Sequence, residues 1–162
     1  PPLLSTPLFL GSSFVYKRQA NKRAYDALIF EIFTTEGWDN VTYDRLSKDL
    51  NVRKSTLQGY YPTSKHFGTA IHGKVLPMLM QQLDITSKEG FIKTWNDALY
   101  SKQFNMIIRM FVQSALSPDT NAGARQGINN LTRLLSEHME RSEAEAIIKT
   151  VLGDSIIVFM NQ

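Results

Sequence analysis

The spacing of apolar residues predicts helices along most of the chain. Within residues 17–37, Ala24, Leu28, Ile32 and Phe33 recur at the spacing that brings side chains back to one face of an α-helix. The range ends on a glycine, the residue that most readily adopts the left-handed conformation after a helix. We therefore expect a first helix with these four residues on its inner face.

A short second helix is predicted by the residues that follow position 40. Thr42 is a favourable N-cap, and Val41 before it can pack against Leu46, the fourth residue of the helix. Leu46 and Leu50 are one turn apart and form an inner face. Asn51 can adopt the left-handed conformation that ends such a helix.

A third helix is expected at about 53–61, with Leu57 and Tyr61 facing inward and Pro62 preventing its continuation. Two helices this short, joined by about three residues, form a helix-turn-helix. The outer face of the third helix then offers cations, hydrogen-bond donors and acceptors, and no acid, which suits a DNA surface. A short polar helix on a protein surface is the alternative. The residues of this face are Arg53, Lys54, Ser55, Thr56, Gln58, Gly59 and Tyr60.

The segments on either side of these three helices carry different patterns. Residues 1–16 have no charged side chain and contain three prolines, so we expect an arm that is extended or packed on a neighbour. On the other side, Thr63 or Ser64 can cap a fourth helix that runs toward Leu83. Pro77 lies inside that helix and predicts a kink or a hinge.

Aromatic and methionine side chains form two helical stripes in the second half of the chain. Such residues either fill the core of a helical domain or line a pocket for a mainly apolar small molecule, and the sequence leaves both interpretations open. The stripes consist of Phe91, Trp95, Leu99 and Tyr100, and of Phe104, Ile107, Ile108, Phe111 and Val112, with Met106 and Met110 beside them.

Two further apolar helices are expected after a loop at residues 118–124. Ser142 and Glu145 have the spacing of a capping box at the start of the second of these helices. The apolar stripes of the two helices can fill the core of the chain itself or cover a second copy, and both can hold, because each helix can bury one face in its own chain and one across a two-fold axis. The candidates for a dimer interface are Leu131, Leu135, Ile148, Leu152, Ile156 and Phe159.

Charge separates the two halves of the 162-residue chain. Residues 1–74 carry ten Lys or Arg against six acidic residues, a net charge of +4, whereas residues 75–162 carry eight against nine, a net charge of −1. A basic half beside a neutral half favours an anionic partner, most simply nucleic acid. An ordinary solvated surface is the alternative.

Composition excludes several classes of protein. Hydrophobic residues make up 43% of the chain, which predicts a globular protein, and no apolar run approaches the ~20 residues of a membrane helix. The absence of cysteine excludes a disulfide scaffold and fits the reducing cytoplasm. His66, His72 and His138 are scattered, and no phosphate-binding or nucleophile motif is present. We therefore predict no enzyme, no catalytic residue, no metal site and no cofactor.

A set of short motifs has fixed spacing across the three predicted N-terminal helices and their two turns. The motifs are Ala27-Leu28, Ile32-Phe33, Glu36-Gly37-Trp38, Val41-Thr42, Leu46-Ser47, Leu50-Asn51-Val52, Lys54-Ser55-Thr56-Leu57 and Tyr60-Tyr61-Pro62. Through these motifs the chain resembles the N-terminal domain of the TetR family of bacterial transcriptional regulators.

The resemblance implies an all-α protein with a three-helix DNA-binding domain at residues 17–72 and a helical ligand-binding and dimerisation domain at 73–162. It implies a homodimer whose two third helices enter successive major grooves of a palindromic operator, ~34–36 Å apart. It also implies a repressor that is released from double-stranded DNA by a small-molecule effector.

Transferred position by position, the resemblance implies that Lys54, Ser55 and Thr56 approach base edges, while Thr42 and Tyr60 bind backbone phosphates. Basic residues before or within the first helix are further candidates for backbone or minor-groove contacts, namely Lys17, Arg18, Lys22 and Arg23. The implied pocket region contains Phe91, Trp95, Tyr100, Phe104, Met110 and Phe111.

Several positions depart from the family pattern. Arg53 replaces the usual hydroxyl cap and adds a cation, while Gln58 and Gly59 stand where the family has aromatic residues. Gln58 can read an adenine, and Gly59 allows close backbone approach. The expected phosphate-binding lysine falls on Ser64, with Lys65 one place later. These departures favour a diverged operator, and the alternative is a helical ligand- or protein-binding module with little sequence-specific DNA affinity.

Overall fold

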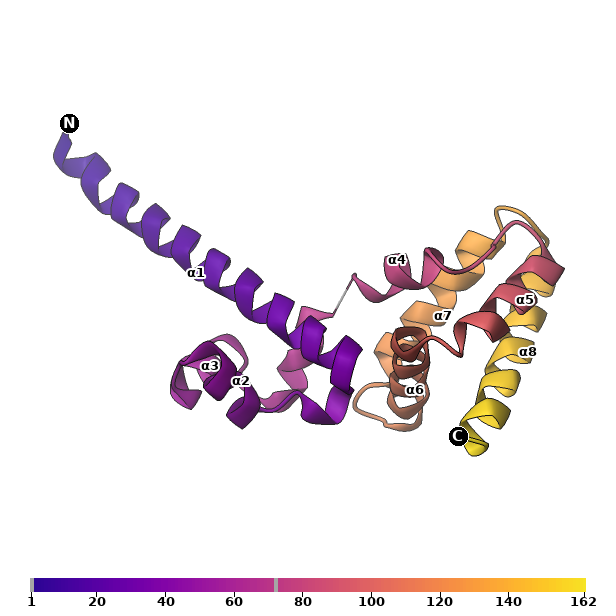
Figure 1. Ribbon diagram of the computed structural model, residues 1–162. Helices are drawn as coiled ribbons and strands as arrows, with labels where there is room; N and C mark the ends of the chain where they lie inside the picture. The colour runs from indigo at the N-terminus through magenta and orange to yellow at the C-terminus, as the bar shows by residue number, and fades with distance from the viewer. Residues whose placement is uncertain (1, 72) are drawn as a thin grey trace. The chain divides into compact units, whose positions relative to one another are not determined.

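The computed structural model describes residues 2–71 and 73–162, with side chains from residue 13 onward (Figure 1). Within these residues the chain forms helices and connecting turns and contains no strand, which confirms the all-α fold class. The chain divides into two compact units, residues 1–72 and 73–162.

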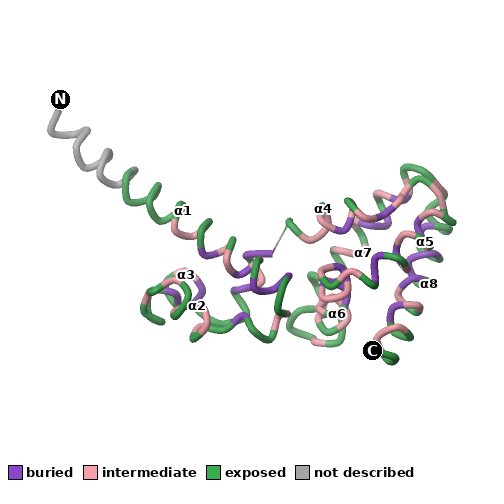
Figure 2. The backbone as a smooth tube through the Cα atoms, in the orientation of Figure 1, coloured by how far each residue is buried: buried purple, intermediate pink, exposed green. Residues whose placement is uncertain are grey.

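Unit 1, residues 1–72, contains α1 (Pro2–Glu36), α2 (Tyr43–Leu50) and α3 (Lys54–Tyr60). Two 3-10 helices, η1 (Trp38–Asn40) and η2 (Ser64–Ala70), connect and extend them. The helix α1 contacts η1, α2 and η2, while α2 packs on α3. Fully buried side chains hold these elements together, and the backbone coloured by burial shows where they lie (Figure 2). They include Ile29, Phe33, Leu46, Leu57, Tyr61 and Phe67.

Local sequence signals set the ends of α1 and α2. Gly37 ends α1 with φ +99°, a backbone angle that favours glycine. The Thr42 side chain accepts a hydrogen bond from the backbone N–H of Arg45, so Thr42 is the N-cap of α2. Asn51 closes α2 in the left-handed conformation, with φ 53°. These three predictions are confirmed.

The predictions for the N-terminal region need two corrections. An extended arm at residues 1–16 is wrong for residues 2–16, because α1 is helical from Pro2. The predicted inner face of α1 is shifted by one position in its first half, since Tyr25 and Ile29 are buried whereas Ala24 is exposed and Leu28 is half-buried. Tyr25 is drawn inward because its ring packs edge-on against an aromatic ring of α3.

A single fourth helix from Ser64 toward Leu83 is also wrong. The chain forms η2, then a turn in which Gly73 has φ +77°, and then a separate α4 (Val75–Met80). Pro77 is the third residue of α4, where no backbone N–H is needed within the helix, so α4 accommodates it in its first turn. The proline is therefore not an interior kink or hinge of a long helix.

Unit 2, residues 73–162, contains α4, α5 (Lys88–Ala98), α6 (Lys102–Leu116), α7 (Asn121–Leu135) and α8 (Arg141–Met160). The helix α5 packs on α8, α6 on α7 and α7 on α8. Its core includes Phe91, Leu99, Phe104, Ile107 and Val151.

Two predicted boundaries in unit 2 are wrong. The helix α7 begins at Asn121, so the last four residues of the expected loop at 118–124 are helical. The helix α8 begins at Arg141 with Glu140 as N-cap, which places Ser142 inside the first turn. The capping box of Ser142 and Glu145 therefore does not form. Across residues 2–71 and 73–162, no helix has the length and apolarity to cross a membrane.

Candidate nucleic-acid interface

The turn between α2 and α3 is held by local hydrogen bonds. After Asn51, the N–H of Val52 donates to the carbonyl of Ser47, and the Ser47 hydroxyl donates to the carbonyl of Val52. Arg53 then caps α3 in an extended conformation. Leu57 and Tyr61 are fully buried, so α3 is fixed by one face and its opposite face is turned to solvent.

The outer face of α3 is exposed and free of acidic residues. Its exposed members are Arg53, Lys54, Ser55, Thr56, Gln58 and Gly59, with Tyr60 half-buried beside them. Ser64 and Lys65, at the start of η2, are exposed as well. The side chains predicted for DNA contact are therefore all accessible in unit 1.

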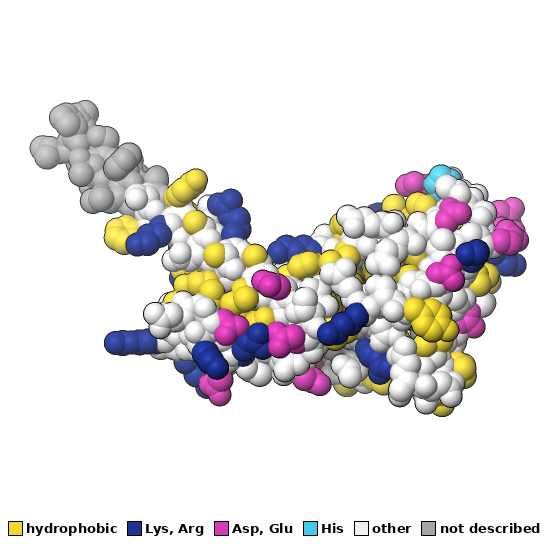
Figure 3. All heavy atoms as spheres, viewed as in Figure 1, with side chains coloured by type: hydrophobic (Ala, Val, Ile, Leu, Met, Phe, Trp, Pro, Cys, Tyr) yellow, Lys and Arg dark blue, Asp and Glu magenta, His cyan; other side chains and the backbone are white. Residues whose placement is uncertain are grey.

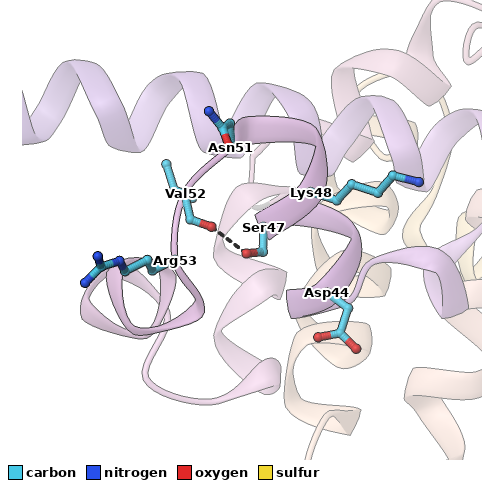
Figure 4. A pocket seen from close by; sticks show the side chains of 6 residues that line it. All are labelled: Asp44, Ser47, Lys48, Asn51, Val52 and Arg53. Carbon is cyan, nitrogen blue, oxygen red and sulfur yellow. Dashed lines mark hydrogen bonds between the residues drawn. The ribbon is translucent and has the colours of Figure 1, made fainter.

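A shallow hollow lies over the helix-turn-helix turn (Figure 4). Asp44, Ser47 and Lys48 line it from α2, and Asn51, Val52 and Arg53 line it from the turn. Lys48 and Arg53 extend away from each other from this hollow (Figure 4). Its lining includes two cations and one acid, so it adds positive charge beside α3.

The acidic side chains around α2 are partly neutralised by Arg45. Its guanidinium donates two hydrogen bonds to the Glu36 carboxylate, at 2.8 and 2.6 Å, and one to Asp49 at 2.7 Å. Hydrogen bonds to Glu36 and Asp49 raise the pKa of Arg45 further above its ordinary value. Arg45 therefore holds α1 and α2 together and is already occupied.

The hydroxyl groups of Thr42 and Tyr60 each keep a proton that can be donated to an anion. The Thr42 oxygen accepts from Arg45, so its hydroxyl proton remains available. The Tyr60 hydroxyl accepts from the Asn21 side chain at 3.3 Å and likewise retains its own proton. Both hydroxyls can donate to a phosphate oxygen.

Some basic residues of α1 contact other side chains of unit 1, and others are exposed to solvent. Lys22 bonds to Asp26 at 2.8 Å and to Thr69 at 3.2 Å, and lies 4.4 Å from the centre of the Tyr61 ring. Lys22 is thus part of the packing of unit 1, and its contact with DNA stays a prediction. Lys17 and Arg23 are exposed. Figure 3 shows Lys and Arg side chains projecting from the surface of unit 1.

The aromatic residues predicted for a ligand pocket pack on one another. The Trp95 ring lies 5.7 Å from Phe91 and 5.1 Å from Phe104, and its Nε1 donates to the Ser155 hydroxyl at 2.8 Å. These three aromatic residues are buried, while Met110 and Phe111 are half-buried. Tyr100 does not belong with them, because α5 ends at Ala98 and the Tyr100 side chain is 82% exposed.

The predicted dimer residues fall into two groups. Leu131, Leu135 and Ile148 are at most 5% exposed within unit 2, so they form its core and are not available to a second copy. Leu152 and Phe159 are half-buried, and Ile156 is 39% exposed. The first group therefore lies in the core of unit 2, and a dimer contact remains a prediction for the second group.

Sequence reasoning missed the apolar residues that α8 does leave exposed. Ile157 is 59% exposed and Met160 is 73% exposed, and both lie with Ile156 in the last turns of α8. Gly153, one turn before Ile157, is also exposed. The available signal was the uninterrupted apolar run at residues 156–160, because a helix that is apolar all round needs cover on more than one side.

The fold and the exposed α3 face define unit 1 as a helix-turn-helix module. Residues 72–159, more than half of the chain, match the family described as the tetracycline repressor LuxT C-terminal domain. The chain belongs to the TetR family of transcriptional regulators. TetR-type regulators bind DNA and are not enzymes.

Curated relatives agree with this assignment. The biofilm operon icaADBC HTH-type negative transcriptional regulator IcaR of Staphylococcus aureus, from strains Newman and COL, is 26% identical over 133 residues. The match covers 76% of this chain and 69% of the relative. In the described part of the chain, no group of three or more His, Cys, Asp or Glu side chains is placed to hold a metal ion.

Proposed function

We propose that this protein is a homodimeric, sequence-specific DNA-binding repressor whose binding is released by a mainly apolar small molecule. The observation that carries the proposal is the outer face of α3. It exposes Lys54, Ser55, Thr56 and Gln58 without any acidic residue, on a helix anchored by buried residues of its opposite face. Repression is supported by the similarity to IcaR, which is described as a negative regulator.

Within this proposal some residues of unit 1 contact bases and others contact the DNA backbone. Lys54, Ser55, Thr56 and Gln58 contact base edges, because their side chains supply the donors and acceptors that distinguish bases in the major groove. Thr42, Arg53, Tyr60, Ser64 and Lys65 contact the backbone, and these contacts fix the position of α3. Gly59 allows the DNA backbone to approach α3 closely.

The second copy binds the exposed apolar face at the end of α8. Ile156, Ile157 and Met160 form this face, and Gly153 lets another helix approach it. In such an isologous dimer the same face of both copies forms the contact, and each pairwise contact occurs twice. Two copies of α3 then read the two halves of a palindrome.

The effector acts in unit 2. Phe91, Trp95, Phe104, Met110 and Phe111 supply an apolar, polarisable region of the kind that binds apolar molecules. To release the protein, the effector must bind the DNA-incompetent state more tightly, and such coupling is typically about 1–3 kcal/mol. The coupling passes through the segment of η2 and α4, which joins the two units.

Selection of bound sequences from a random duplex pool, at moderate salt, tests the proposal. We expect enrichment of a two-fold symmetric motif whose half-sites lie about one helical turn apart, ~34–36 Å. Binding of the selected duplex is expected to weaken steeply with salt, since each neutralised phosphate releases counterions. No enrichment over the input pool would contradict sequence-specific binding and favour a ligand- or protein-binding module.

A further inference from the structure

Arg18 links α1 to the C-terminal end of α3. Its Nη2 atom donates to the carbonyl oxygen of Gly59 at 2.7 Å, across 41 positions of sequence. The guanidinium carbon also lies 4.3 Å from the centre of the Tyr60 ring, within the range of a cation–π contact. One side chain thus contacts both the backbone and a side chain of the last turn of α3.

Two side chains from other helices donate to carbonyl groups at the end of α3: Arg18 to Gly59, and the Tyr43 hydroxyl of α2 to the C-cap residue Tyr61. The last carbonyl groups of a helix have no N–H donor inside the helix, and they favour a nearby cation. The last turn of α3 contains no basic residue, and its backbone closure is the bond from the N–H of Tyr61 to the carbonyl of Leu57. Arg18 therefore supplies, from α1, a cation at this terminus and a donor to the Gly59 carbonyl.

The Tyr60 ring is held on several sides by α1. Tyr25 meets it edge-on, with ring centres 5.0 Å apart and planes at 86°. Asn21 donates to its hydroxyl at 3.3 Å, and Arg18 covers its face. Three residues of α1 therefore fix both the ring and the hydroxyl that faces the DNA in the proposed function.

We propose that Arg18 is a positioning residue that orients the end of α3 and the Tyr60 hydroxyl for DNA reading, and is not simply one more phosphate contact. This inference rests on the proposed function, in which α3 reads DNA. Arginine suits the role because its planar guanidinium can donate a hydrogen bond and stack on a ring at once. A lysine has the same charge but cannot do both.

The first test uses the free protein, so it does not depend on DNA binding. Amide hydrogen exchange of Tyr60 and Tyr61 is measured by NMR in the wild type, Arg18→Ala, Arg18→Lys and Lys17→Ala. Loss of one hydrogen bond at the helix end should speed exchange at these amides about three- to tenfold in Arg18→Ala. Arg18→Lys should resemble Arg18→Ala, and Lys17→Ala, which removes a neighbouring charge, should resemble the wild type. Unchanged exchange in Arg18→Ala would overturn the proposal.

The second test measures binding to the duplex selected by the wild type and to a scrambled duplex of the same composition, over a series of salt concentrations. Positioning predicts that Arg18→Ala lowers the preference for the selected duplex about three- to tenfold while the salt slope stays unchanged. Arg18→Lys should not restore that preference. A slope reduced by about one per chain, with full rescue by Arg18→Lys, would identify a phosphate contact and overturn the proposal.

The two tests separate failure of this inference from failure of the proposed function. If the wild type selects no duplex, sequence-specific DNA binding is wrong, and the exchange measurement still decides whether Arg18 holds the end of α3. If a duplex is selected but Arg18→Ala behaves as the wild type in both measurements, the proposed function stands and the role of Arg18 is refuted.

Discussion

The α3 face of unit 1 and the end of α8 in unit 2 are both exposed, and they differ in chemistry. The outer face of α3 in unit 1 is polar, contains Lys54 and Arg53, and has no acid. The outer face of α8 in unit 2 ends in Ile156, Ile157 and Met160. Exposed polar residues cost little in water, whereas a cluster of exposed apolar residues indicates a surface that is covered in the working assembly.

The contacts that hold α3 in unit 1 also differ from those that hold α8 in unit 2. Polar contacts add to the buried face that anchors α3, since the Tyr61 hydroxyl bonds to Asp26, and Arg18 bonds to the Gly59 carbonyl. Apolar burial is the main anchor of α8, and two side-chain hydrogen bonds from α5 add to it, Trp95 to Ser155 and Asn96 to Asp154. Hydrogen bonds fix direction and angle more narrowly than apolar contacts do. This difference suits the proposed function, in which α3 reads bases and the end of α8 binds a second copy.

The largest expected effect comes from placing a charge on the α8 face. Ile157→Glu puts a carboxylate into the proposed dimer contact, and by symmetry it does so twice. Because an unpaired buried charge is costly, the dimer dissociation constant should rise by at least about a hundredfold. Sedimentation velocity over a concentration series measures this change.

The control for that variant is Ala115→Glu, which adds the same charge at an exposed position of α6. It should leave the association unchanged. A wild type that is monomeric at all concentrations, or an Ile157→Glu variant that dimerises as well as the wild type, would show that the exposed end of α8 is not the dimer contact.

The second effect concerns the polar anchor of α3. Burial, and then the hydrogen bond to Asp26, raise the pKa of Tyr61 above its ordinary value. Tyr61→Phe should lower the free energy of unfolding by about 1–3 kcal/mol at neutral pH, because a hydrogen bond to a charged group is lost. Chemical denaturation followed by circular dichroism measures the change.

The same variant has a defined pH dependence. A raised pKa means that the folded protein keeps the Tyr61 proton where the unfolded chain releases it. The stabilising contribution is thus complete below the unfolded pKa, near pH 10, and is lost as the pH rises through the folded pKa. Tyr61→Phe should therefore reduce the loss of stability above pH 10. An alkaline loss identical to that of the wild type would show that Tyr61 titrates as an ordinary tyrosine.

The fold was predictable where a short stretch of sequence decides the structure. Thr42 caps α2 through a bond to a residue three positions away, and Asn51 ends the same helix by its own backbone preference. The register of α1 was not predictable in this way. Ala24 and Tyr25 are both compatible with a helical stripe, and the choice between them depends on Tyr60, which is 35 positions further along the chain.

The candidate site shows the same division. The exposed residues of α3 follow from its two buried positions, Leu57 and Tyr61, because a helix with one buried face exposes the other. The role of Arg18 could not be inferred from its sequence neighbourhood, since its partners lie in α3. In α8, Ile148 and Ile157 are chemically alike, and only the packing of α5 and α7 decides which of them is buried.

A third, smaller effect is expected when a single base-reading residue of α3 is removed. Lys54→Ala should change which bases are preferred at one position of each half-site, with about tenfold lower affinity for the wild-type sequence, as one good base contact contributes about 1–3 kcal/mol of discrimination. Repeating the duplex selection with the variant measures the change. Lys48→Ala removes an exposed cation from α2 as a control and should leave the selected motif the same. If Lys54→Ala weakens all sequences equally, Lys54 contacts phosphate instead of a base.

The smallest effect tests why the α3 face contains a glycine. A Cβ atom at Gly59 would meet no atom within 4 Å, so the fold of unit 1 does not require glycine there. Gly59→Ala should therefore stabilise the free protein by up to about 1 kcal/mol, since alanine favours the helix. Affinity for the selected duplex should nevertheless fall by a few-fold, because the added methyl group occupies the space needed for close approach of the DNA backbone.

Gly123→Ala is the matched control, because Gly123 lies in α7 and is also free of any contact within 4 Å of an added Cβ. It should stabilise unit 2, by less because it lies in the first turn of its helix, and leave DNA affinity unchanged. Thermal unfolding and fluorescence anisotropy with the selected duplex measure the two quantities. If Gly59→Ala raises stability and lowers affinity, while Gly123→Ala leaves affinity unchanged, the DNA backbone lies against the end of α3. A gain in stability at Gly59 without any loss of affinity would show that the DNA does not approach α3 at that point, and base contacts would then be confined to its N-terminal turn.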